Sequence, residues 1–252
     1  MRGEAQYRAN VIVVLFGSLA YQGVGLAFIG VVVGRFGQIG GWSLSEILFL
    51  YGLRLTAHGL WFVFFNQIGQ IDTVVLQGEF DRFLVRPINP LLQLMTRRAA
   101  LAYFGDLIGG VALLSYAASA VDIDWSIGRV LFLMTAVLGG ALVEVSIQLT
   151  LSAFSFRLLS TRMLRVNVDM MFNTFGSYPM SIFPNIVRMI LTFVLPVAFV
   201  AFFPAAVLLE HDWEIGFSLW LPVMSPCVGI FLFILAYRFW IGQMRNYQSS
   251  GH

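Results

Sequence analysis

The chain has 252 residues, a formal net charge of +2, a single cysteine and fifteen basic residues, all of them arginine. Hydrophobic residues make up 59% of it and charged residues only 11%, against about 25% charged in an average soluble protein. This composition excludes an ordinary soluble domain and predicts a membrane protein. The basic residues form no continuous basic face, so no nucleic-acid partner is expected. One cysteine, Cys227, cannot form an internal disulfide.

Six stretches are long and apolar enough to cross a bilayer, because a spanning helix needs about 20 apolar residues for a hydrocarbon layer of roughly 30 Å. They cover about 11–34, 46–69, 97–118, 128–156, 182–204 and 219–241. Ser43 followed by Glu46 has the spacing of a capping box, which places the start of the second span near Leu44. The sequence therefore predicts an all-α, polytopic membrane protein that forms one transmembrane domain over residues 1–252.

The arginines fall mostly on one side of these spans. If the N-terminus is cytoplasmic, eleven of the fifteen lie in inner segments, including Arg157, Arg162 and Arg165 in the loop after the fourth span. Because short loops rich in arginine stay on the cytoplasmic side, both termini are expected inside. We expect a multi-pass protein of the inner or plasma membrane of a prokaryotic cell.

The loop between the second and third spans contains a segment, about 74–85, that fits a short amphipathic helix. Its apolar residues share one helical face: Leu76, Phe80, Phe83 and Leu84. Its charged residues, and the one that follows it, point elsewhere: Glu79, Asp81, Arg82 and Arg86. Pro87 ends the helix, since proline disfavours helix in the residue before it. Such a helix lies in the membrane interface or docks on a partner protein, and the alternative is a solvated turn in contact with lipid.

Among the polar side chains inside the predicted spans, four are candidates for pairing: Arg54, His58, Asp106 and Glu144. A lone charge near the bilayer centre costs about 2.5–3.5 kcal/mol, so such groups normally face protein or water and pair with one another. Arg54 and His58 are four residues apart and share one helical face. We hypothesise that Arg54 pairs with Asp106 or Glu144, within one subunit or between two, as a structural clasp. The alternatives are a snorkelling side chain and a direct contact with a transported substrate.

The predicted fifth span contains three prolines, Pro184, Pro196 and Pro204. Each proline removes a backbone hydrogen bond, and backbone exposed to lipid cannot stay unsatisfied. Breaks at this depth indicate a kinked helix packed against protein or a re-entrant segment that lines a cavity. A kink that serves packing alone is the alternative.

Catalytic and metal-binding patterns are absent from the sequence. The three histidines lie far apart, and a single cysteine gives no zinc pattern, so no metal site is expected. The absence of lysine excludes a nucleotide-binding P-loop, because that motif uses lysine on the terminal phosphates. Any ATP and Mg²⁺ would therefore be bound by another polypeptide. A proton-coupled transporter that uses Asp106 or Glu144 as a relay, or a channel, stays open as the alternative function.

Several motifs occur in an order and spacing that is similar to a known family. They are Tyr7-Arg8, the run from Gly78 to Pro87, Tyr178-Pro179-x-x-Ile182-Phe183-Pro184, Leu195-Pro196-Val197-Ala198-Phe199 and Phe203-Pro204-Ala205. Together they resemble the permeases of type-2 ABC exporters over nearly the whole chain. The resemblance implies six transmembrane helices, an inner coupling helix between the second and third, and a broken region near the fifth. It also implies a non-catalytic permease that acts with separate ABC ATPase subunits and with a second permease, either a paralogue or a second copy.

On this resemblance, segment 74–85 would seat in a groove of the ATPase. Phe80 and Phe83 would be its apolar anchors, and Glu79, Asp81 and Arg82 would set its polar registration, with Arg86 at its end. The first two spans and the broken part of the fifth would form the translocation path. The sequence does not identify the cargo, and it leaves import open beside export.

Overall fold

The structure, a computed structural model, describes residues 2–97, 104–158, 160–211 and 220–247. Its described residues are helical, joined by turns and by one isolated bridge between Ile39 and Trp42. Four helices are long and apolar enough to cross a membrane. The expectation of an all-α membrane protein is therefore confirmed.

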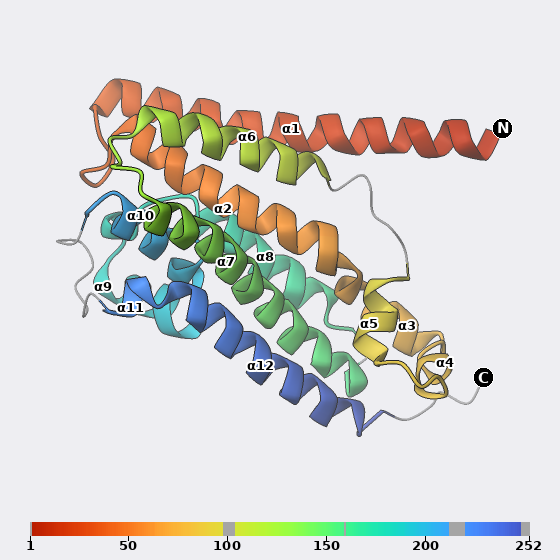
Figure 1. The fold of residues 1–252 in the computed structure, drawn as a ribbon. Helices are drawn as coiled ribbons and strands as arrows, with labels where there is room; N and C mark the ends of the chain where they lie inside the picture. Colours follow the sequence, from red (N-terminus) through yellow and green to blue (C-terminus); the bar gives the residue numbers. More distant parts are fainter. Residues whose placement is uncertain (1, 98–103, 159, 212–219, 248–252) are drawn as a thin grey trace.

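Long helices lie side by side with α2 and α7 near the centre of the bundle (Figure 1). These helices are α1 (Arg2–Phe36), α2 (Leu44–Phe65), α6 (Phe104–Ala120), α7 (Ile127–Ala153), α8 (Arg162–Phe175) and α12 (Ser225–Met244). The predicted capping box is present: the Ser43 side chain accepts from the Glu46 N–H, the Glu46 carboxylate accepts from the Ser43 N–H, and α2 begins at Leu44. This local prediction is confirmed.

The bundle has two ends, named here after one residue at each. At the Asp72 end, residues 66–97 fold into a group of short helices that we call the platform. Its helices are η1 (Asn66–Gln70), α3 (Ile71–Leu76), α4 (Asp81–Leu84) and α5 (Pro90–Met95). The Trp42 end holds the turn between α1 and α2. There Trp42 is fully buried and stacks on His211, with ring centroids 4.6 Å apart.

Helix α8 and the residues after it run opposite to α2: α8 itself reaches from the platform to the level of Arg54, at the middle of α2, and residues 176–181 continue to the start of α2. Arg165 near its start donates to the carbonyls of Ile68 and Gly69 at 3.2 and 2.8 Å. Beyond its end, Ser181 donates to the Gly40 carbonyl at 3.2 Å. The interpretation of Arg162 and Arg165 as part of a loop is wrong, because this stretch is a helix whose polar side is covered by protein. It lacks the continuous apolar run by which a lipid-facing helix is recognised.

The predicted fifth span, 182–204, is a series of short segments in place of one helix. They are η4 (Met180–Ile182), α9 (Asn185–Met189), the π-helical η5 (Ile190–Val194), η6 (Val197–Phe199) and the start of α10 (Phe202–Leu208). Pro184 directly precedes α9 and Pro196 directly precedes η6, so the chain changes direction at both. Pro204 lies in the first turn of α10, where a missing N–H costs nothing.

This segment enters the bundle and returns to the same end. Val200 lies against Gly140, at the middle of α7, and Val197 lies against Gly176 just after α8. The chain then turns back, because Phe202 and His211 both pack on Trp42. The short helix α11 (Trp220–Val223) leads into α12.

Close approach of α7 and α12 depends on two glycines. A Cβ at position 229 would lie 2.2 Å from the carbonyl oxygen of Gly139, which is backbone and cannot rotate away. Glycines at a helix–helix contact let backbones approach closely, as is common in membrane bundles.

We predict that Gly229→Ala separates α7 from α12 and destabilises the protein by about 1–3 kcal/mol, the usual cost of overpacking. Gly242→Ala in the same helix is the matched control, because nothing lies within 4 Å of its added Cβ. Thermal unfolding of both variants in detergent provides the measurement. Equal unfolding temperatures for the two would contradict the glycine contact.

Candidate functional site

Four polar residues on and just after α8 face the interior of the bundle: Arg165, Asp169, Asn173 and Ser177. They recur every fourth residue, so they line one face of the helix. We call this row the polar stripe. Its members meet polar groups of α2, α7 and the platform at three successive levels.

At the first level the stripe holds the platform through a buried ion pair. The Arg165 guanidinium donates to the Asp72 carboxylate at 3.0 Å, and both side chains are less than one-tenth exposed. Asp72 also accepts from the N–H and hydroxyl of Thr161, at 3.2 and 3.0 Å, and from the Ser155 hydroxyl. With so many donors on one carboxylate, the pair is satisfied and ties α3 to α8.

At the second level a histidine and two carboxylates lie together. His58 Nδ1 is 2.7 Å from Glu144 Oε2, and both side chains are buried. One ligand atom from each of His58, Glu144 and Asp169 lies within 4.8 Å of the others. One imidazole and two carboxylates form a donor set that zinc accepts, so these residues could hold a divalent cation. Sequence spacing did not indicate this site, because the three residues come from three different helices.

At the third level Arg54 meets the end of the stripe. Arg54 is 2% exposed, and its guanidinium donates to the Asn173 side-chain oxygen and, at 3.4 Å, to the Ser177 hydroxyl. Arg54 Nε is buried without a hydrogen-bond partner among the described residues.

The hypothesised pair of Arg54 with an acid is not formed within the described part of this chain. Glu144 pairs with His58, which lies one turn after Arg54 along α2. Asp106 lies beyond Gln22, whose amide donates to it at 3.4 Å. The four-residue spacing correctly placed Arg54 and His58 on the same face of α2. The Glu144 carboxylate of α7, however, lies beside His58 and not beside Arg54. A pair between subunits stays a prediction.

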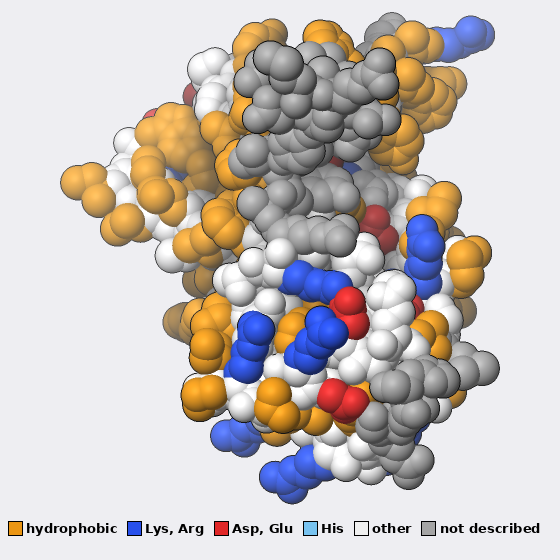
Figure 2. Space-filling view, turned by 90° about the vertical axis from the view of Figure 1, so that its right-hand side faces the viewer, with side chains coloured by type: hydrophobic (Ala, Val, Ile, Leu, Met, Phe, Trp, Pro, Cys, Tyr) orange, Lys and Arg blue, Asp and Glu red, His pale blue; other side chains and the backbone are white. Residues whose placement is uncertain are grey.

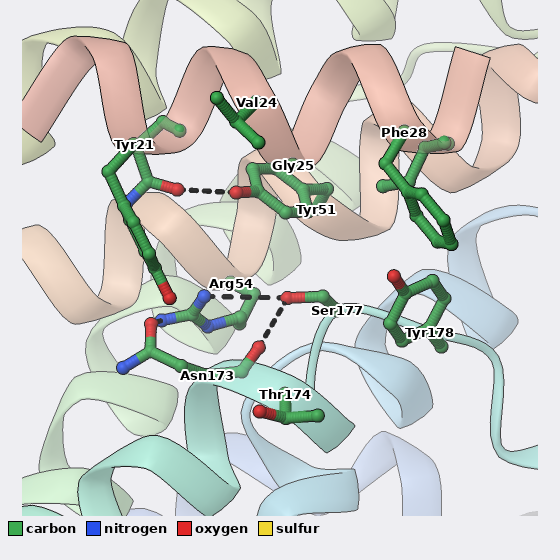
Figure 3. A pocket seen from close by; sticks show the side chains of 12 residues that line it. Tyr21, Val24, Gly25, Phe28, Tyr51, Arg54, Asn173, Thr174, Ser177 and Tyr178 are labelled. Atoms are coloured by element: carbon green, nitrogen blue, oxygen red, sulfur yellow. Dashed lines mark hydrogen bonds between the residues drawn. The ribbon is translucent and has the colours of Figure 1, made fainter. Parts of the chain in front are cut away.

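A cavity of about 340 Å³ opens between α1, α2 and the end of α8 (Figure 3). Arg54, Asn173 and Ser177 form its polar floor, and the Tyr51 hydroxyl donates to Gln22 on its wall. On the α1 side its lining residues include exposed apolar and aromatic side chains: Tyr21, Val24 and Phe28.

The platform differs from the predicted single helix over 74–85. Gly78 has a positive φ of 66°, which glycine adopts without strain. The chain therefore turns there and separates α3 from α4. The predicted apolar face is split as a result. Phe80 points inward, whereas Leu76 and Leu84 are exposed.

Phe80 is an internal anchor in this structure. It is 0% exposed, and its ring lies 5.0 Å from Phe156, 5.0 Å from Tyr247 and 6.4 Å from Trp240. Its predicted role as a contact for another protein is corrected, because the C-terminal part of the same chain occupies its surroundings. The ring of Phe83, half-buried, lies 5.9 Å from that of Phe80.

The charged residues of the platform lie nearer its surface. Glu79 pairs with Arg97 within the platform. Asp81 is half-buried, and Arg82 and Arg86 are exposed. Arg82 and Arg86 are therefore accessible to a partner.

Sequence reasoning missed the polar partners on α8 and on the platform: Asp72, Arg165, Asp169, Asn173 and Ser177. A signal was present in the four-residue spacing of Arg165, Asp169 and Asn173, which is typical of a helix with one polar face. The arginines of this region instead suggested a solvated loop.

Comparison with known families decides the class of the protein. The family model described as ABC-2 family transporter protein matches residues 19–251. The chain belongs to the ABC-2 transporter family. The match includes the platform, the polar stripe and the broken segment at 182–211, so the resemblance to type-2 ABC permeases is confirmed. No curated protein and no solved structure gave a significant match. ABC-2 membrane proteins are typically non-catalytic subunits that associate with an ABC ATPase.

In this ABC-2 protein the Asp72–Arg165 pair should dominate the stability of the Asp72 end. We predict that Asp72→Ala costs about 3–5 kcal/mol, because it leaves the Arg165 charge buried without its partner. Glu210→Ala is the control. It breaks the more exposed pair with Arg129 and should cost about 0–1 kcal/mol.

Unfolding of both variants by SDS in mixed micelles measures the difference. A small and equal loss of unfolding free energy in Asp72→Ala and Glu210→Ala would contradict the prediction that the buried Asp72–Arg165 pair stabilises the protein strongly.

Proposed function

We propose that this ABC-2 protein is the permease subunit of an ABC exporter. It forms a translocation path with a second permease subunit and is driven by separate ABC ATPase subunits, which bind ATP and Mg²⁺. The observation that carries the proposal is the family match over residues 19–251, together with a platform whose charged surface stands at one end of the bundle.

The proposed topology has six crossings, of which the fifth is α8 and its flanking residues. The contacts of Arg165 with Gly69 and of Ser181 with Gly40 support this, because they join the chain to opposite ends of α2. The start of α1 and the end of α12 both lie on the side of the platform, as an even number of crossings requires (Figure 1). The re-entrant segment at 182–211 then belongs to the Trp42 end.

Charge supports a cytoplasmic position for the Asp72 end. The view onto this end shows several arginines and few acids (Figure 2). Exposed arginines in and near the platform and beside the ends of α7, α8 and α12 are Arg82, Arg86, Arg157, Arg162 and Arg245. Arginine in short segments is retained in the cytoplasm, which is also where an ABC ATPase works.

The platform would transmit movement of the ATPase to two helices of the bundle, α8 and α12. The exposed residues of α4 and the turn after it, among them Leu84 and Val85, offer an apolar contact to the ATPase beside Arg82 and Arg86. Inside the platform, Phe80 contacts the end of α12, and Asp72 holds α8. Movement of the platform would therefore shift the polar stripe relative to α2.

A second candidate function is proton-coupled transport, and the cluster of buried His58 and Glu144 with half-buried Asp169 is the observation that favours it. Intramembrane carboxylates and histidines do serve as proton relays. That function predicts cargo flux in response to a pH gradient with no nucleotide and no ATPase.

We predict that Val85→Asp weakens association with the co-expressed ABC ATPase by roughly 30-fold, since a central apolar contact is worth about 2 kcal/mol. Val85 is 83% exposed, so the fold should tolerate the change. Ile127→Asp is the matched control. It is equally exposed at 83%, lies at the Trp42 end, and puts an acid where a helix N-terminus favours it.

Copurification of the ATPase with each variant, and ATP-dependent transport in vesicles, provide the measurement. Gel filtration checks that both variants are folded. Undiminished ATPase recovery and transport in Val85→Asp would count against the platform as the docking surface.

A further inference from the structure

Arg54 has no directly paired counter-ion within the described part of the chain, and Asp169 of the polar stripe is linked to it only through the Asn173 side chain. The two hydrogen-bond acceptors of Arg54, Asn173 and Ser177, are both neutral, and no carboxylate oxygen forms an ion pair with it. Its Nε is buried and without a partner among the described residues. A guanidinium held at this depth normally pairs with an anion, because charges in a membrane interior face a partner or water.

Space for an anion exists beside it. The cavity over Arg54 has a volume of about 340 Å³, within the range of roughly 300–1,000 Å³ usual for ligand pockets. The Tyr21 hydroxyl points toward Arg54 and Asn173 from the α1 side (Figure 3).

The cavity is amphipathic. Its floor is polar, with Arg54, Asn173 and Ser177, whereas Val24 and Phe28 on the α1 side are apolar and exposed. A ligand that matches both parts has an anionic head and an apolar body. A cation is disfavoured by Arg54, and a small anion alone would leave the apolar wall uncovered.

We propose that this cavity binds the anionic headgroup of an amphiphilic cargo, with Arg54 as its counter-ion and the apolar body along α1. Arginine suits carboxylate and phosphate alike, because its planar N–H groups match their oxygens. The role as cargo rests on the proposed export function, whereas binding itself requires neither an ATPase nor a second permease.

The position of the Arg54 guanidinium depends on two residues of the polar stripe, Asn173 and Ser177. They hold the guanidinium from below, at the floor of the cavity that Arg54 lines, and Nε has no acceptor among the described residues. Gln22 and Tyr51 are hydrogen-bonded to each other on the wall, and Gln22 in turn binds Asp106. This arrangement keeps the Asp106 carboxylate on the far side of Gln22, so an incoming anion meets Arg54 first.

The test measures binding of matched single-chain amphiphiles to the purified permease in phosphatidylcholine nanodiscs, by thermophoresis of protein labelled at the exposed Cys227. The probes share a twelve-carbon chain: dodecyl phosphate, dodecanoate, dodecanol and dodecyltrimethylammonium. We expect the two anions to bind and Arg54→Gln to weaken them by about tenfold or more. Dodecanol should be unaffected, and a preference for one anion identifies the headgroup class.

Two further variants separate binding from folding. Gly25→Leu fills the cavity from α1 without touching Arg54, so it should also abolish binding of both anions. Arg238→Gln removes an exposed arginine from α12 and should change nothing. If Arg54→Gln does not fold, Gly25→Leu decides the question alone.

The proposal is overturned if the wild type binds all four probes equally, or if Arg54→Gln and Gly25→Leu bind the anions as the wild type does. It is also overturned if a carboxylate of the second permease is found cross-linked at the cavity, since Arg54 would then have its counter-ion. Failure of the ATPase to copurify would reject the proposed function and leave this binding result standing.

Discussion

The bundle depends on the polar face of α8 being covered by α2, α7 and the platform. Lipid offers no hydrogen bonds, so a helix that carries polar groups such as Arg165, Asp169 and Asn173 can lie at membrane depth only if protein satisfies them. Asp72 and Arg54 meet the two ends of this face, and His58 with Glu144 lies between. Each of these contacts fixes the rotation of α8 about its axis. The position of the re-entrant segment follows, because Val197 packs directly beyond the end of α8.

The same face connects the two ends of the molecule. Asp72 belongs to the platform and Arg54 to the floor of the cavity, and the polar stripe joins them through one rigid helix. Phe80 provides a second connection, from the platform to the end of α12. A force applied at the platform would therefore reach the cavity by way of packed side chains. This is a physical basis for coupling the proposed ATPase to the proposed cargo site.

Much of the fold could be predicted from local patterns. The apolar lengths of α2, α7 and α12 and the capping box at Ser43 depend on neighbouring residues alone, and each was recognisable. Helix α8 was not, because only one side of it is apolar, with Met163 and Met170 exposed there, whereas the other side carries the polar stripe, so the sequence shows no continuous apolar run. The partners of Arg54, Asn173 and Ser177, could not be predicted, because they depend on which part of α8 packs opposite Arg54 in the folded chain. Gly78 was a visible signal for the break in the platform, but the periodicity of Phe80, Phe83 and Leu84 outweighed it.

The most direct test of this account is the side of the membrane on which each end of the α8 segment lies. Single cysteines at Arg157 and Asn185, both exposed, are placed in a Cys227→Ser background and labelled in intact cells with a membrane-impermeant maleimide. The account predicts that the cysteine at 185 reacts from outside and the one at 157 only after the membrane is opened, because α8 crosses between them. Labelling of both from the same side would show that α8 does not cross, and would contradict the account.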